Sequence, residues 1–390
     1  MIWKEEVMNK IEKLITELCP NGVEYKKLGE VCKISRGVRV TKKDLVESGK
    51  YPVVSGGIGY MGYLDKYNRE SETITIAQYG TAGYVKWQTE KFWANDVAFS
   101  VFPNADFIDN RFLFFLLINM QEYLYSISNR DAIPYSIERE KILDTSIPLP
   151  PLPIQQQIVN ILDNFTELEA ELEAELEARK RQYEYYRDNL IINDKWVKDS
   201  LGKVGTFIRG KRFVKNDIIS EGIPCIHYGE MYTYYKIWAK KTKSFLDQNL
   251  TKKLRLAHTN DVIIVAAGET VEDIGNAVAW LGESDVVFHD ACFAFSHKEN
   301  PKYISYFMQT EYFRSQIRRY ITSSKVSAIN AAGLSKAKIP LPPLAEQNRI
   351  VSILDKFDKL VNDLSEGLPA EIAARRKQYA YYRNKLLTFE

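Results

Sequence analysis

The sequence predicts an α+β fold with a pseudo-twofold internal repeat: two mixed α/β domains separated by two long α-helices that pair as an antiparallel coiled coil. Three observations support this prediction. The segment Ile147–Phe165 returns as Ile339–Phe357 with thirteen of nineteen residues identical, and a second repeated block begins at Ala178 and again at Ala374. Each repeated stretch carries apolar residues at helical spacing. The regions before the repeats are rich in glycine, aromatic and β-branched residues, which favour short strands and turns.

Length and composition place the chain among globular proteins of two or three domains. It has 390 residues, of which 45% are hydrophobic and 27% are charged, and its formal net charge is +2. This near neutrality excludes a uniformly basic protein, so any surface for nucleic acid must be local. The longest apolar run, Phe112–Ile118, is too short to span a bilayer.

The first residues and the cysteines indicate a cellular compartment. Charged residues at Lys4–Glu6 stand where a signal peptide would need an apolar core. The cysteines lie far apart in the sequence and show no zinc-binding spacing: Cys19, Cys32, Cys225 and Cys292. This usage favours free thiols in a reducing environment. We therefore expect a cytoplasmic protein.

Composition shifts divide the chain into five predicted segments. They are an N-terminal helical arm (1–24), a first domain (25–146), a connector with the first spacer helix (147–193), a second domain (194–338), and a connector with the second spacer helix (339–390). A helix is expected over about Trp3–Leu18 in the arm. Each connector opens with closely spaced prolines, which favour extended backbone.

The two spacer helices follow the proline-rich connectors. The first is expected over about Ile154–Ile192, a length of roughly 58 Å at 1.5 Å per residue. The second carries Gly367-Leu368-Pro369, which should kink or interrupt it. Both have an unbroken apolar stripe with coiled-coil-like periodicity. The alternative is two unrelated helices that expose their polar faces to solvent.

Charge order predicts how the helices pair. Asp163–Glu177 holds seven acidic residues and no base, whereas the end of the second helix is basic, with Arg375, Arg376 and Lys377. Like charges four residues apart destabilise a helix on its own, so the acidic stretch requires a basic partner. An antiparallel pair sets acid against base at both ends.

The two domain interiors resemble each other only at landmarks. Strands are expected at Thr73–Ala77, Asp96–Phe102 and Asp261–Ala266, and helices at Arg111–Ile127 and Ile304–Tyr320. Both domains begin with a Leu-Gly pair, followed eight residues after its leucine by an Arg-Gly pair. These are Leu28-Gly29 and Arg36-Gly37 in the first domain, and Leu201-Gly202 and Arg209-Gly210 in the second, at an offset of 173.

The layout resembles the specificity subunit of type I restriction-modification enzymes over essentially the whole chain. The paired IPLPPL connectors, the paired Q..IV.ILD.F helix starts and the paired R..QY.YYR..L helix ends carry the resemblance. The opening Glu17–Tyr25 and the four-residue repeats Glu169–Leu172 and Glu173–Leu176 are also similar to such subunits. The four extra residues Gly367–Ala370 of the second helix depart from exact symmetry.

The resemblance implies a function and partners. Each domain would be a target-recognition domain that reads one half of a bipartite site in double-stranded DNA. The helices would set the spacer and dock two methyltransferase (modification) subunits, and restriction/translocase subunits would complete the complex. S-adenosylmethionine, ATP and Mg would then reside on those partners, with no cofactor in this chain. The alternative is a subunit of the same build in a methylation-only or other DNA-modification or defence assembly, and a third hypothesis is a coiled-coil scaffold without DNA specificity.

The residues give little support for catalysis. No nucleotide-binding glycine loop is present in the expected context. Glu24-Tyr25-Lys26 has half of a nuclease signature but lacks an upstream aspartate at suitable spacing. His289, Asp290, Cys292 and His297 could suggest a metal, yet such a set in a strand-rich region is more often ordinary packing. We expect a non-catalytic subunit with no metal site.

Candidate DNA-binding residues are basic and polar amino acids near turns. Phosphates require Lys or Arg, and the edges of DNA bases require hydrogen-bonding side chains. In the first domain they are Arg36, Arg39, Lys42, Lys43, Ser55, Tyr60, Gln78, Tyr79 and Lys86; in the second they are Arg209, Lys211, Arg212, His227, Tyr228, Lys240, Lys241, Lys243 and Lys325. The glycine-rich loops Ser55–Tyr60 and Gln78–Gly83 would let backbone approach DNA closely. The competing interpretation is plain hairpin turns and solvated lysines.

Four residues are candidates for contact with a partner protein. Tyr185 and Tyr381 fall off the apolar stripe of their helices, while Tyr183, Tyr186, Tyr379 and Tyr382 lie on it and are expected to pack between the helices. Gln155 and Gln347 beside the connectors are added on the resemblance alone.

Overall fold

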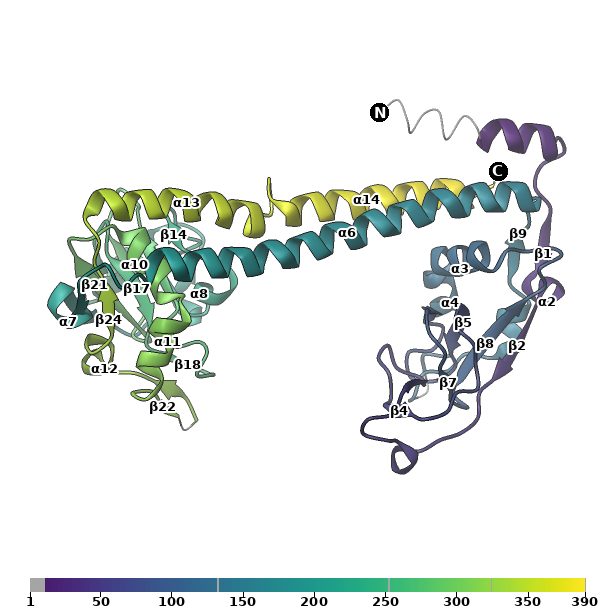
Figure 1. Ribbon diagram of the computed structural model, residues 1–390, viewed down its shortest axis with the longest axis horizontal. Coiled ribbons are helices and arrows are strands. Elements are labelled where there is room, and N and C mark those ends of the chain that lie inside the picture. Colours follow the sequence, from purple (N-terminus) through teal and green to yellow (C-terminus); the bar gives the residue numbers. More distant parts are fainter. Residues whose placement is uncertain (1–10, 132, 252, 324, 390) are drawn as a thin grey trace. The chain divides into compact units, whose positions relative to one another are not determined.

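The computed structural model describes residues 11–131, 133–251, 253–323 and 325–389. These residues form two compact units (Figure 1). Unit 1 comprises 1–173 and 372–390, and unit 2 comprises 174–371. The division runs through both spacer helices, so each unit contains one mixed α/β domain and the helix segments packed on it. Of the arm helix predicted at Trp3–Leu18, residues 11–18 are helical and the rest lies outside the described residues.

Unit 1 contains a four-stranded antiparallel sheet in the order β2-β8-β5-β6 and a three-stranded sheet in the order β4-β3-β7, in which β3 and β7 run parallel. The strands are β1 Tyr25–Lys27, β2 Cys32–Arg36, β3 Tyr51–Val54, β4 Tyr63–Leu64, β5 Thr73–Ala77, β6 Val85–Gln88, β7 Trp93–Ala94, β8 Ala98–Pro103 and β9 Ser146–Pro148. The predicted strand Thr73–Ala77 is confirmed.

The short helices of unit 1 are α2 Leu28–Val31, η1 Lys42–Asp44 (a 3-10 turn), α3 Asn110–Asn119, α4 Gln121–Ser126 and α5 Arg139–Leu143. Of these, α3 packs on strands β6 and β8 of the larger sheet. Phe112, Leu116 and Leu124 are buried in one core with strand residues such as Ile76 and Phe99. Burial of such side chains stabilises the unit by about 1.5–3 kcal/mol each.

Unit 2 repeats this plan with more strands. Its sheets have the orders β11-β21-β17-β19-β14, β12-β15-β13-β20-β16 and β18-β23-β22. The strands are β10 Lys198–Ser200, β11 Gly205–Arg209, β12 Ile218–Ile219, β13 Ile223–Ile226, β14 Trp238–Ala239, β15 Ser244–Leu246, β16 Leu256–Ala257, β17 Val262–Val265, β18 Ala267–Gly268, β19 Ala277–Trp280, β20 Val286–Phe288, β21 Cys292–His297, β22 Thr322–Ser323, β23 Ser327–Ala328 and β24 Lys338–Pro340.

The helices of unit 2 are α7 Leu201–Val204, η2 Lys215–Asp217, α8 Glu230–Thr233, α9 Gln248–Thr251, α10 Pro301–Met308, α11 Glu311–Arg318 and α12 Ala331–Ser335. All except α8 and α9 have a counterpart at the corresponding place along the chain in unit 1. The single helix predicted at Ile304–Tyr320 is wrong in one respect. Thr310 adopts extended backbone and accepts a hydrogen bond from Phe313 N, so it ends one helix and caps the next. Arg111–Ile127 is likewise two helices, α3 and α4.

The spacer helices are α6 Leu152–Ile191, α13 Leu344–Asn362 and α14 Leu368–Leu387. The predicted interruption of the second helix is confirmed, because α13 ends before Gly367 and α14 begins after it. A Cβ at Gly367 would lie 2.5 Å from the carbonyl oxygen of Lys359, so glycine is required there. Pro369 follows at the second position of α14, where its missing N–H removes no helical bond.

Repeated aromatic contacts hold the helices together within each unit. In unit 1 the ring of Phe165 at the start of α6 stacks on Tyr382 of α14, with centroids 5.6 Å apart. In unit 2 the ring of Phe357 in α13 stacks on Tyr186 near the end of α6, at 5.5 Å. The start of one helix thus packs on the end of the other in both units. This is the antiparallel arrangement that the charge order predicted.

Ion pairs between the helices join the acidic stretch of the first helix to the basic end of the second. The side chain of Arg376 bonds both Glu169 and Glu173 in unit 1. Glu175 instead pairs with Arg179 of its own helix. Acid therefore faces base, as the charge order predicted. Glu169 and Glu173 share one basic partner because residues four apart lie on the same helix face.

Charge reversal tests this pairing. Arg376→Glu should lower the thermal unfolding midpoint, because it places three carboxylates together where the helices meet. The triple variant that adds Glu169→Arg and Glu173→Arg should recover most of the loss, as measured by circular dichroism. Glu171→Arg is the matched control and should not rescue Arg376→Glu. Equal rescue by both would contradict the pairing.

The ribbons that join each domain to the helices have the same register. Tyr25 pairs with Pro148 and Lys27 with Ser146 between β1 and β9. Lys198 pairs with Pro340 and Ser200 with Lys338 between β10 and β24. Each domain therefore begins and ends in one two-stranded antiparallel ribbon.

The repeated glycines satisfy a steric requirement. A Cβ at Gly37 would lie 1.9 Å from the carbonyl oxygen of Ala94, and one at Gly210 would lie 2.1 Å from that of His289. No larger residue fits at these contacts without moving the backbone. The weak Arg-Gly echo in the sequence thus marks a place where two chain segments touch in both domains.

Candidate nucleic-acid interface

A basic arm leaves the end of β2 in the first domain. Arg36 is exposed and its guanidinium lies 5.8 Å from the ring centre of Phe99 on the neighbouring strand. Arg39, Lys42 and Lys43 follow and are exposed as well. The arm is shaped by Asp44, whose carboxylate accepts the backbone N–H of Thr41 at 2.7 Å. That bond also lowers the pKa of Asp44.

The two glycine-rich loops of the first domain lie against each other. Gly56 O accepts hydrogen bonds from the backbone N–H and the hydroxyl of Thr81, at 2.9 and 2.8 Å. A Cβ at Gly56 would lie 2.3 Å from Tyr79 O, and Gly80 has a φ of +79°. The glycines are therefore required for packing of the loops, whatever else approaches them. Lys86 sits 4.3 Å above the ring of Tyr60 at the edge of this pair.

Gln78 differs from the other candidates because it is only 4% exposed. Its buried Oε1 has no hydrogen-bond partner. Gln78 therefore lies inside the domain, at the wall of a cleft that Arg36 and Tyr79 also line, and its contact with DNA stays a prediction. The equivalent position in the second domain is Ala266: the backbone N–H of Gln78 donates to Val97 O, and that of Ala266 donates to Ala291 O. The fold accepts a small apolar residue here.

The second domain presents a basic arm at the equivalent place. Arg209 ends β11, lies 5.8 Å from the ring of Phe293, and donates through Nε to Asp290 O at 3.0 Å. Lys211, Arg212 and Lys215 follow and are exposed. Asp217 accepts Val214 N at 2.7 Å, as Asp44 accepts Thr41 N. Both domains thus display a basic arm of one shape.

An aromatic cluster lies beside the second arm. The ring of His227 is 4.8 Å from His289 and 4.6 Å from Tyr228, and Phe213 lies 5.1 Å from His289. Burial lowers the pKa of both imidazoles, so they are neutral at pH 7. The 3.0 Å approach of His289 Nδ1 to Asp290 would be an ion pair only for charged histidine. Because Nδ1 accepts Ala291 N, we assign the neutral form.

The side chains around His289 that could suggest a metal site are not arranged as a metal centre. Cys292 is fully buried and His297 stacks on Phe295. Among the described residues no group of three or more His, Cys, Asp or Glu side chains is placed to hold a metal ion. Sequence analysis missed Phe213 as a member of the cluster, because an isolated phenylalanine carries no signal of contact with two histidines.

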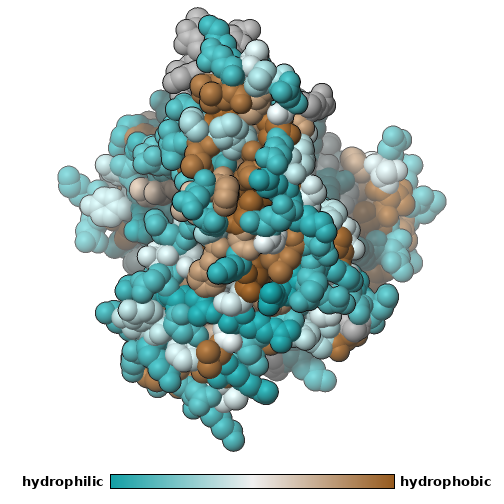
Figure 2. All heavy atoms as spheres, turned by 90° about the vertical axis from the view of Figure 1, so that its right-hand side faces the viewer, coloured by the Kyte–Doolittle hydropathy of each residue, from teal (hydrophilic) through white to brown (hydrophobic). Residues whose placement is uncertain are grey.

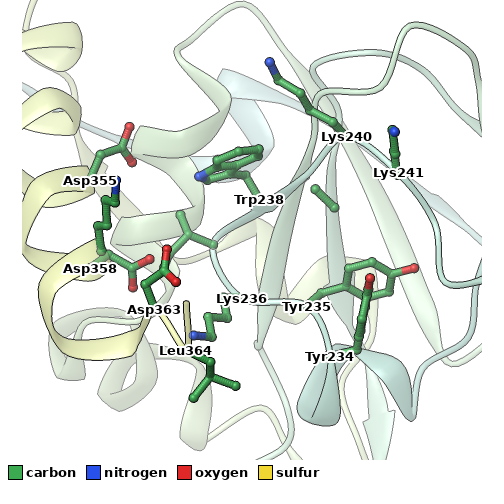
Figure 3. A pocket seen from close by; sticks show the side chains of 13 residues that line it. Tyr234, Tyr235, Lys236, Trp238, Lys240, Lys241, Asp355, Asp358, Asp363 and Leu364 are labelled. Atoms are coloured by element: carbon green, nitrogen blue, oxygen red, sulfur yellow. The ribbon is translucent and has the colours of Figure 1, made fainter. Parts of the chain in front are cut away.

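Lys236–Arg255 is the densest basic segment of the chain, and part of it binds other groups of the same protein. Lys236 Nζ donates to the carbonyl oxygen of Asn362 at the end of α13. Figure 3 shows the cleft beside it, with Asp355, Asp358 and Asp363 on one wall and Lys240 and Lys241 on the other. Lys240, Lys241, Lys243 and Lys325 are exposed, so they remain candidates for phosphate contacts.

Comparison with known proteins decides the family. A family model described as type I restriction modification DNA specificity domain matches the chain twice, over residues 20–178 and 193–374. The chain belongs to this family. It is a type I specificity subunit with two target-recognition domains.

Relatives match this specificity subunit over nearly their whole lengths. It is 33% identical to a Haemophilus influenzae protein provisionally named a type I restriction enzyme specificity subunit, over 94% of this chain and 96% of the relative. It is 31% identical to a type I restriction enzyme specificity subunit of Escherichia coli, over 98% and 97%.

Solved structures share the fold. The S subunit of a type I restriction-modification system from M. genitalium has a TM-score of 0.57 at 16% identity, covering 94% of this chain and 97% of that one. A chain from a study of assembly and conformational transition in the type I system has a TM-score of 0.63 at 17% identity, with the same coverage.

The partner-facing candidates of the specificity subunit divide into two groups. Gln155 and Gln347 are fully buried, which corrects the prediction that they contact a partner. Tyr185 and Tyr381 are 65% and 62% exposed, and their contact with a partner stays a prediction. Tyr183 is buried, and Tyr186, Tyr379 and Tyr382 make ring contacts between helices as predicted.

Tyr381 lines a cleft with both apolar and polar walls. On the face shown in Figure 2, hydrophobic residues gather in a strip between polar ones. A cleft of about 590 Å³ in unit 1 is lined by Ile11, Ile15, Leu386, Phe389 and Tyr381, among others.

In the part of the chain that the structure describes, no helix of the specificity subunit combines the length and apolarity that a membrane crossing needs.

Proposed function

We propose that this specificity subunit recognises a bipartite sequence in double-stranded DNA and catalyses no reaction itself. Each target-recognition domain would read one half-site, and the helices would set the distance between the halves. The observation that carries the proposal is the basic arm repeated at one place in both domains, with Arg36 and Arg209 at its base. Lys and Arg side chains on such arms suit phosphate contacts, which position a protein on the duplex.

The proposal extends to partners. Two methyltransferase subunits carrying S-adenosylmethionine would dock on the helices, and restriction/translocase subunits using ATP and Mg would complete the complex. The exposed Tyr185 and Tyr381 suit such docking, because tyrosines are enriched in protein interfaces. This assignment places the protein inside the cell, with its DNA substrate.

Binding by the complex with methyltransferase subunits tests the function. We expect salt-dependent binding to one bipartite duplex that survives excess competitor DNA, and methylation at that site in a sequenced genome. Equal affinity for all duplexes would contradict sequence recognition and favour a scaffold. Methylation without any ATP-dependent cleavage or translocation, with all encoded partners present, would favour the methylation-only alternative.

Removal of either arm arginine should weaken binding without changing the sequence that is read. Arg36→Ala and Arg209→Ala should each lower affinity for all duplexes and reduce the salt-dependence slope by about one. Lys33→Ala, which removes an exposed base at the far end of β2, is the matched control. A changed half-site in an arginine variant would mean that it reads a base and does not contact phosphate.

A further inference from the structure

We propose that Ser55 and His227 are equivalent specificity-determining residues, each donating a hydrogen bond to the edge of a base in the half-site that its domain reads. The inference rests on the proposed function, because it needs DNA at both domains. It goes further by naming which side chain in each domain contacts a base and which only shapes the surface.

The backbone around these two residues is the same. Val54 pairs in parallel with Ala94 between β3 and β7, and Ile226 pairs in parallel with Phe288 between β13 and β20. Ser55 and His227 are the next residues after those strands. Asn95 N donates to Val54 O at 2.9 Å, and His289 N donates to Ile226 O at 3.2 Å. The two positions therefore correspond residue by residue.

The residue behind each candidate holds the basic arm. Asn95 Oδ1 accepts the backbone N–H of Val40 at 3.0 Å, and its Nδ2 donates to Val40 O at 3.3 Å. The ring of His289 lies 5.1 Å from the ring of Phe213, the counterpart of Val40 at an offset of 173. Asn95 thus holds the first arm through hydrogen bonds beside Ser55, and His289 packs against the second arm beside His227.

Ser55 and His227 each have a polar side-chain group that is available to bind a partner outside the protein. Both are half-buried. Among the described residues no acceptor binds the Ser55 hydroxyl or His227 Nε2. His227 Nδ1 accepts the backbone N–H of Gly229 at 3.2 Å. Neutral His227 therefore carries its proton on Nε2, where it can donate.

Charge and stacking favour a base edge as the partner. Arg212 and Lys215 of the second arm act electrostatically on His289 and His227. DNA phosphates that bind this arm would therefore bring a groove of the duplex over the ring of His227. The rings of Tyr228 and His289 pack beside His227, one tilted and one edge-on, and restrict its rotation. A restricted donor selects bases that offer an acceptor there, such as guanine O6 and N7, adenine N7 or thymine O4. The two domains present different hydrogen-bond donors at the same backbone position, which suits the reading of different half-sites.

The test uses the complex with its methyltransferase subunits and a library of random-sequence duplexes, read by sequencing of methylated sites. His227→Ser should change base preference at one position of the second half-site by about tenfold or more and leave the first half-site unchanged. Ser55→Ala should have the reciprocal effect. His227→Gln, which keeps a donor near Nε2, should retain most of the preference.

His258→Ser is the matched control, because His258 is an exposed histidine of the same domain paired with Asp285, and it should alter neither half-site. Thermal unfolding of each variant checks that the fold is kept. Preferences within about twofold of wild type in folded His227→Ser and Ser55→Ala would overturn the inference while leaving DNA recognition intact. A wild-type complex without any half-site preference would instead overturn the proposed function.

Discussion

Deletion of Glu173–Leu176 from α6 should shorten the gap between the two half-sites by about one or two base pairs and leave both half-sites unchanged. Four helical residues span about 6 Å, and one base-pair step is about 3.4 Å. Leu168, Leu172 and Leu176 recur every four residues, so removal of one unit turns the rest of the apolar stripe by only about 40°. Arg376 should keep its bond to Glu169, because both residues lie outside the deleted segment.

Methylation mapping of the variant complex measures the spacer directly. The matched control replaces Glu173 and Leu176 with alanine at constant length, and it should keep the wild-type spacing although the bond from Arg376 to Glu173 is lost. An unchanged spacing in the deletion variant, or a new half-site sequence, would contradict the idea that this helix sets the distance.

Replacement of either buried glutamine by leucine should destabilise its unit by roughly 2–5 kcal/mol. Gln155 Nε2 donates to Phe107 O at 2.9 Å and to Pro150 O at 2.7 Å, while its Oε1 accepts Asp109 N at 2.8 Å. Leucine has a similar size but cannot make these bonds, so buried backbone groups would lose their partners. Gln347 makes the equivalent bonds to Pro342 O and Asn300 N.

Urea unfolding of the isolated subunit gives the measurement. Gln156→Leu is the control, because Gln156 is exposed on the same turn, and we expect a change within about 0.5 kcal/mol. A loss of partner binding in Gln155→Leu without any loss of stability would restore the docking role that burial argues against.

The helices and connectors of the molecule could be predicted because their sequence occurs twice in the chain. The repeated connectors and helix starts give the helices, and the charge order gives their antiparallel direction. The interruption at Gly367 was also predictable from residue type alone. The exact ion pairs were not, because Glu169 and Glu171 differ only in the face they occupy, and that depends on helix phase.

The candidate site was predicted only in part. Basic arms with exposed arginines after a strand could be predicted from the sequence, but burial of Gln78 and Gln155 could not. Glutamine is usually exposed, and its burial here depends on partners tens of residues away, such as Phe107 O for Gln155. The correspondence of Ser55 with His227 was also invisible, because the offset changes from 173 at the domain start to 172 at these residues, and the side chains share nothing.

The paired ribbons β1–β9 and β10–β24 have a consequence for how such a protein changes. Each recognition domain is attached to the rest of the chain through neighbouring strands of one ribbon, with a glutamine from the adjoining helix fixing the start of its first long helix. The attachment has the same register in both halves, and its second strand ends in Ile-Pro in both, whereas the interior is free to differ. Substitutions, insertions or a whole replacement domain can therefore accumulate between the ribbon strands without disturbing the geometry outside them. Novelty in one domain does not require adjustment in the other.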